Sequence, residues 1–90
     1  MSMTEMDLAT LKMYASELED FKSRVNQHCN NLETGISSCS RYMLDETSKK
    51  ALQKGQQVAE DIKNCLFPAQ MLLDKIYRLI REMESSHDFE

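Results

Sequence analysis

The feature that most constrains this chain is an apolar stripe with a repeat of about 3.5 residues that runs through its second half. The stripe consists of Gly55, Val58/Ala59, Ile62, Cys65/Leu66, Ala69, Leu72/Leu73, Ile76, Leu79/Ile80 and Met83. A half-buried strand would alternate at every second residue, whereas spacings of three and four are typical of an amphipathic helix. The stripe therefore predicts a helix over residues 48–84. We expect one helix with a kink near Pro68, since proline removes one backbone hydrogen bond, and a division into two separate helices is the alternative.

The first half of the chain carries a second stripe with the same spacing. It consists of Leu8, Leu11, Tyr14/Ala15, Leu18, Phe21, Val25, His28/Cys29, Leu32 and Ile36. This pattern predicts a helix over residues 5–37, with Thr4 and Asp7 as a capping box at its start. Hydroxyl-rich residues 38–47 are expected to form the turn, with Asp45 or Thr47 as the N-cap of the next helix. Residues 85–90 read as a polar tail.

Two helices joined by a short turn predict a single all-α domain over residues 1–90, an antiparallel two-helix hairpin. Matching the stripes places Leu32 opposite Gly55, and a register shifted by one heptad would match the apolar residues as well. Two such helices cannot enclose a core by themselves, so we expect the hairpin to form a homodimer or heterodimer as a four-helix bundle. The residues left for that partner are Phe67, Met71, Leu72, Tyr77, Leu79 and Ile80.

Composition excludes several classes of function. The net charge of −4 argues against DNA, RNA or anionic lipid as a primary partner. No apolar run has the ~18 residues of a membrane span, and the acidic N-terminal segment does not resemble a cleaved signal peptide. We expect synthesis in the cytoplasm. Three cysteines without a C-x-x-C spacing predict free, buried thiols rather than a disulfide framework.

No group of residues in the sequence predicts catalysis. His28 and Cys29 are adjacent, so on a helix they point about 100° apart and do not converge on one metal ion. Glu84 and His87 have the Glu-x-x-His spacing of di-iron bundles, but only one copy is present. The chain also lacks a glycine-rich phosphate loop. We therefore predict a protein that is not an enzyme, with no catalytic residues, no cofactor and no metal site.

The pattern of the whole chain resembles the WXG superfamily, the small ESAT-like helical hairpins of type VII secretion in Gram-positive bacteria, which include small partners of LXG toxins. In that family a Trp-x-Gly motif occupies the hairpin turn, where this chain has Tyr42, Met43 and Leu44. The aromatic residue is kept and the glycine is not. The family's export signal, Tyr-x-x-x-Asp/Glu, is also absent, because Tyr77 is followed four residues later by Arg81.

The resemblance implies a non-enzymatic function. The chain would pair with the helical hairpin of a secreted effector, or with a WXG-like partner, and support its export without a cleaved signal peptide. The missing export signal favours a partner that escorts, or is carried by, a second protein. An alternative from another class is a cytosolic coiled-coil adaptor or regulator that self-associates.

Overall fold

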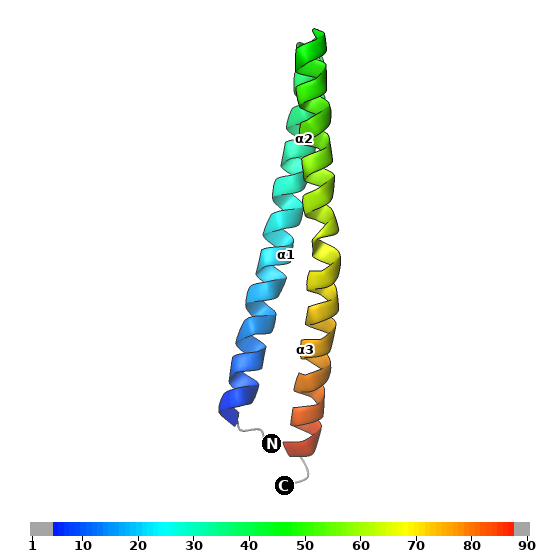
Figure 1. Ribbon diagram of the computed structural model, residues 1–90. Helices are drawn as coiled ribbons and strands as arrows, with labels where there is room; N and C mark the ends of the chain where they lie inside the picture. The colour runs from blue at the N-terminus through cyan, green and yellow to red at the C-terminus, as the bar shows by residue number, and fades with distance from the viewer. Residues whose placement is uncertain (1–4, 88–90) are drawn as a thin grey trace. The chain divides into compact units, whose positions relative to one another are not determined.

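The computed structural model describes residues 5–87, and within that range it contains three helices and no strand. The helices are α1 (Glu5–Cys39), α2 (Glu46–Asn64) and α3 (Leu66–His87) (Figure 1). The predicted all-α helical hairpin is confirmed. The predicted cap at Thr4 lies outside the described residues. Of the expected polar tail, residues 85–87 belong to α3 and residues 88–90 lie outside the described range.

Helix α1 is longer than its sequence indicates, ending at Cys39 rather than near residue 37. The hydroxyl group of Thr34 donates to the carbonyl oxygen of Asn30 at 3.0 Å. The amide of Ser40 donates to the Ile36 carbonyl at 2.9 Å, which completes a last helical turn. Hydroxyl side chains that bond back to the preceding turn are compatible with helix, so the residues expected to break α1 are instead accommodated in it.

Helix α2 begins with a side-chain cap at Asp45, one of the two predicted candidates. The Asp45 carboxylate accepts from the backbone N–H of Ser48 at 3.0 Å and from the Ser48 hydroxyl at 2.6 Å. These bonds, the side-chain bond foremost, hold the pKa of the Asp45 carboxyl below its usual value. The cap occupies one of the amide groups that a helix start leaves without a partner.

The second predicted helix is divided at Cys65 into α2 and α3. The amide of Cys65 donates to the Ile62 carbonyl at 3.0 Å, a tighter bond pattern than that of an α-helix. Pro68 is then the third residue of α3, where its missing N–H costs no hydrogen bond within that helix. The second helix is thus bent near Pro68 and divided at Cys65, which was the alternative to one continuous kinked helix.

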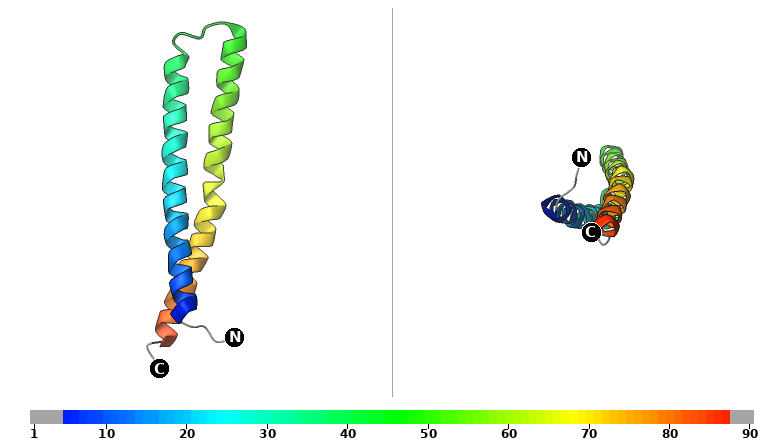
Figure 2. Two further views of the ribbon diagram at one scale, coloured as in Figure 1. Left: turned by 90° about the vertical axis from the view of Figure 1, so that its left-hand side faces the viewer. Right: turned by 90° about the horizontal axis from the view of Figure 1, so that it is seen from below.

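The structure separates into two compact units. Unit 1 contains the described residues up to Lys22 together with those from Pro68 onward, and unit 2 is Ser23–Phe67. Helix α1 contributes to both. In unit 2, the second half of α1 and α2 run antiparallel and are joined by the turn over residues 40–45 (Figure 2).

Close packing in unit 2 depends on small residues. Cys29 and Ala59 are buried, with 2% and 0% of their surface exposed. A Cβ atom built at Gly55 would lie 3.2 Å from Cδ1 of Ile36. The prediction that Gly55 faces Leu32 is therefore wrong by one helical turn, and Leu32 is 51% exposed. Lys63 and Glu33 form an ion pair of 3.0 Å between the two helices.

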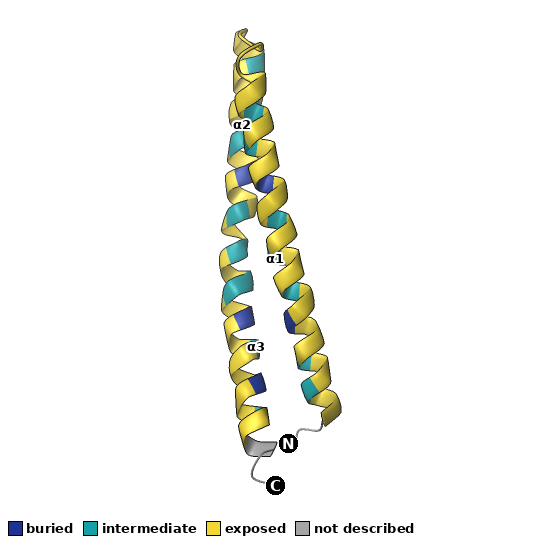
Figure 3. Ribbon diagram, turned by 180° about the vertical axis from the view of Figure 1, so that it is seen from behind, coloured by how far each residue is buried: buried dark blue, intermediate teal, exposed yellow. Residues whose placement is uncertain are grey.

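In unit 1, the first half of α1 packs against α3 around a small core. Its buried residues are Ala15, Leu73 and Ile80, and Leu8, Leu11, Leu18 and Ile76 pack against them. Buried positions lie on the facing sides of the helices, and the outer sides are exposed (Figure 3). Antiparallel pairing follows from the ion pair between Lys12 and Glu84, at 3.6 Å, and the bond of Lys22 to Gln70.

Candidate protein-binding groove

Unit 1 contains an apolar groove between α1 and α3, with a volume of about 420 Å³. It is lined by Leu11, Tyr14, Glu17, Leu18 and Phe21 of α1 and by Leu72 and Ile76 of α3. Leu11, Leu18 and Ile76 are partly buried against the core and form the floor. Tyr14, Phe21 and Leu72, with exposed fractions of 55%, 55% and 52%, form the walls.

Helical spacing explains why the groove residues share one edge of unit 1. Tyr14 and Phe21 are seven residues apart on α1, and so lie two turns apart on the same side. Leu72 and Leu79 have the same spacing on α3, and Leu79 is 36% exposed. Glu17 is the charged residue that lines the groove. On α3, Lys75 lies three residues after Leu72, within one turn of it.

The other edge of unit 1 is polar. Lys12 and Glu19, also seven residues apart, lie on a different side of α1 from Tyr14 and Phe21. Lys12 pairs with Glu84, and Glu19 accepts a hydrogen bond of 3.5 Å from the Tyr77 hydroxyl. Loss of water around the phenol, followed by the charge of Glu19 and this bond, raises the pKa of Tyr77 above its usual value. One edge is thus bridged by polar contacts and the other is open and apolar.

The residues that the sequence assigned to a partner fall in different places. Leu72 lines the groove, and Tyr77 belongs to the polar edge. Leu79 is 36% exposed and is not among the residues that line the groove. Ile80, predicted to face a partner, is instead in the core of unit 1 with 7% of its surface exposed. It is buried there because it meets Ala15 and Leu73.

Phe67 and Met71 are 75% and 54% exposed, stand one turn apart on α3 and are not among the residues that line the groove. The structure therefore does not bring the six predicted residues together. Tyr14 and Phe21 are groove residues that sequence reasoning assigned to the inner stripe. A spacing of seven residues fits both the buried contact between two helices and the exposed border of that contact. The periodicity of the sequence therefore could not show that Tyr14 and Phe21 line a groove.

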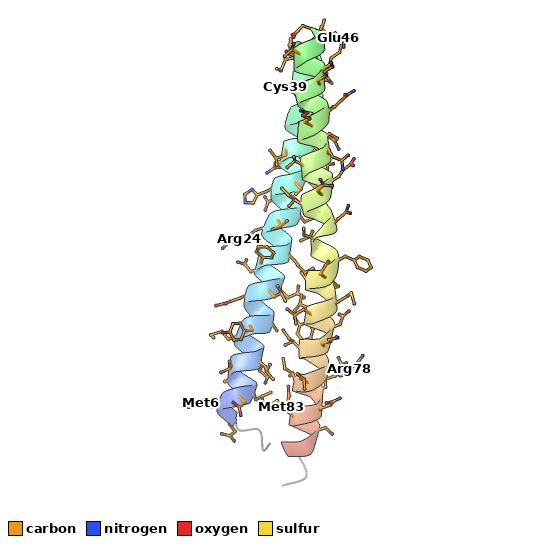
Figure 4. The ribbon with its side chains drawn as sticks, viewed as in Figure 1. Met6, Arg24, Cys39, Glu46, Arg78 and Met83 are labelled. Carbon is orange, nitrogen blue, oxygen red and sulfur yellow. The ribbon has the colours of Figure 1, made fainter. Side chains whose placement is uncertain are left out.

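The predicted hairpin turn is strongly exposed. Tyr42, Met43 and Leu44 have exposed fractions of 84%, 38% and 66%. They lie between Cys39, the last residue of α1, and Glu46, the first of α2, which are labelled in Figure 4.

The thiols and potential metal ligands form no site in the described part of the chain. All three cysteines are free, as expected, but only Cys29 is buried, and the prediction of buried thiols is wrong for Cys39 and Cys65. Among residues 5–87, no three His, Cys, Asp or Glu side chains are grouped so that they could hold a metal ion. None of the described helices is long and apolar enough to cross a membrane.

Comparisons of the chain with models of protein families, with curated proteins and with solved structures give no match.

Proposed function

We propose that this protein is a non-enzymatic helical-hairpin protein of type VII secretion. It pairs with a helical hairpin of a secreted effector, or with a WXG-like partner, and supports the export of that partner. The half-exposed apolar groove of unit 1 carries the pairing part of this proposal. The link to type VII secretion rests on the resemblance of the sequence to the WXG superfamily.

The dimensions of the groove favour a helix as its occupant. From Leu11 to Phe21 the groove follows α1 for about 15 Å, or roughly three helical turns. A partner helix with apolar residues at i, i+3 or i+4, and i+7 presents its side chains over the same length. A small molecule is a poorer fit, because small-molecule sites enclose most of their ligand and the groove walls are half-exposed.

The small core of the chain supports the same proposal. In the described residues, the buried apolar side chains are Ala15, Cys29, Ala59, Leu73 and Ile80. Three of these are Ala or Cys and bury little apolar area. Covering Tyr14, Phe21 and Leu72 with a second helical surface would add more buried apolar area than these small residues supply.

Co-expression with the N-terminal helical domain of a candidate effector tests the function. We expect a 1:1 complex in native mass spectrometry, and Phe21→Ser should weaken it by about tenfold or more because an apolar side chain leaves the interface. Phe67→Ser is the matched comparison, since it makes the same change at an exposed position outside the groove.

Two results would contradict this proposal. In one, Phe67→Ser weakens the complex and Phe21→Ser does not, which would place the partner on the outer side of α3. In the other, the chain forms a stable homodimer that no effector domain displaces. That second outcome would favour the alternative function, a self-associating cytosolic adaptor.

A further inference from the structure

The turn of unit 2 presents three consecutive apolar side chains to solvent. We refer to Tyr42, Met43 and Leu44 as the apolar tip. The tip is held by hydrogen bonds, since the amides of Tyr42 and Met43 each donate to the Cys39 carbonyl at 3.0 Å. The Asp45 cap fixes the other end of the turn. With both ends tied to helices, the backbone holds Tyr42 and Leu44 in water at 84% and 66% exposure.

The segment around the apolar tip has the opposite charge to the rest of the chain. Residues 34–51, which lie within about 8 Å of helical rise of the two ends of the turn, contain three cationic residues (Arg41, Lys49 and Lys50) and two anionic ones (Asp45 and Glu46), a net charge of +1. The whole chain has a net charge of −4, so the remaining residues carry −5. One of the two anions, Asp45, is bonded to Ser48.

Because salt screens distant charges, a surface that contacts the tip interacts mainly with the charges close to the tip. At physiological ionic strength, interactions between exposed charges fade over about 8 Å. Glu33 is six residues before the end of α1, or roughly 9 Å of helical rise. The net acidity of the chain therefore does not decide what the tip attracts.

We propose that the apolar tip inserts into the headgroup region of an anionic phospholipid bilayer, with the side chains of Arg41, Lys49 and Lys50 beside the lipid phosphates. Tyrosine favours the interface of a bilayer, and long basic side chains extend their charge toward the headgroups. A protein groove fits the tip less well, because three adjacent turn residues lack the spacing by which a helix fills a groove. This contact is peripheral and is independent of the proposed pairing through unit 1.

A single reporter can test the insertion, because the chain contains no tryptophan. Tyr42→Trp keeps an aromatic ring at the tip and supplies the only indole fluorescence. We expect a blue shift when vesicles containing phosphatidylglycerol are added, quenching by lipids brominated near the headgroup, and no shift with pure phosphatidylcholine. Adding Leu44→Ser to this variant should weaken vesicle binding by about tenfold, because an apolar side chain is lost from the tip. Replacing Lys49 or Lys50 with Gln should weaken binding by about fivefold for each charge removed.

Tyr14→Trp provides the matched control, as it makes the same change in the groove of unit 1. Its emission should not shift with the same vesicles. The proposal is overturned if the emission of the Tyr42→Trp variant is unchanged by anionic vesicles, if neutral vesicles shift it equally, or if the Tyr14→Trp variant shifts as much. Circular dichroism establishes that each variant remains helical, and a failure here leaves the effector-binding result unaffected.

Discussion

Leu72 and Leu73 are neighbours in α3 with different environments, since Leu73 is fully buried and Leu72 is 52% exposed. Leu73→Ala should lower the free energy of unfolding by about 2–4 kcal/mol, because it leaves a cavity in the core of unit 1. Leu72→Ala should change that free energy by at most about 0.5 kcal/mol. Urea unfolding followed by circular dichroism measures both values. Equal losses would mean that the core does not lie on the Leu73 side of α3.

The groove wall predicts a second difference between these residues. Leu72→Ala should weaken pairing with a helical partner while leaving the isolated chain folded, because Leu72 lines the groove. Titration calorimetry of the variant against an effector domain measures this loss. Unchanged affinity would exclude the α3 wall from the interface.

At the scale of the element, the start of α2 depends on Asp45. Replacing Asp45 with Ala should lower the melting temperature at neutral pH, because the Ser48 amide and hydroxyl lose their acceptor. The pKa of Asp45 is lowered in the folded chain, so its stabilising effect is present above the unfolded pKa of about 3.9. That effect is lost as the pH falls through the lower folded pKa. The melting temperatures of the two proteins should therefore converge in acid; a constant difference would contradict the capping role.

Two glycines, Gly35 and Gly55, lie inside helices, and replacing each with Ala compares the gain in helix propensity with the effect of a tight contact. A Cβ atom at Gly35 would meet nothing within 4 Å, so Gly35→Ala should stabilise the chain by about 0.5–1 kcal/mol. At Gly55 the added atom would lie 3.2 Å from the end of the Ile36 side chain, which must shift to accommodate it. Gly55→Ala should therefore stabilise less than Gly35→Ala in chemical denaturation. A larger gain at Gly55 would contradict the close approach of α1 and α2.

At the scale of the whole molecule, the limited burial in each unit predicts that stability depends on a partner. Only five apolar residues of the described range are buried, and most are small. An effector domain present at a free concentration of a hundred times its Kd should raise the stability of the folded chain by about 2.7 kcal/mol. Thermal scans at increasing partner concentration measure this effect. A melting temperature independent of the partner would argue against pairing of the folded hairpin.

Much of the secondary structure was predictable from the sequence, because the hydrophobic repeat extends over both halves of the chain. Spacings of three and four residues over many turns are incompatible with a strand, and the Ser-rich segment before Asp45 separates the two halves. The exact ends of α1 were less predictable. Hydroxyl groups can terminate a helix or bond back to it, and only the geometry around Thr34 and Ser40 selects between these.

The candidate groove could not be predicted because the sequence leaves the inner side of each helix ambiguous. Adjacent positions such as Tyr14/Ala15 and Leu72/Leu73 are about 100° apart, so either member fits a 3.5-residue stripe. At Tyr14/Ala15, close packing of two helices favours the smaller residue, so Ala15 is buried and Tyr14 lies at the edge. At Leu72/Leu73 the two residues are identical, and only the direction in which α3 faces α1 decides that Leu73 is buried.

The sequence by itself therefore determined that both halves of the chain are helical and pair antiparallel, since both follow from local spacing and the length of the turn. The division of the second half at Cys65 came from the structure. The tertiary structure decided which side of each helix is buried and which is open to a partner. Burial depends on two surfaces in contact, and the spacing of apolar residues along one helix gives no information about the shape of the helix that packs against it.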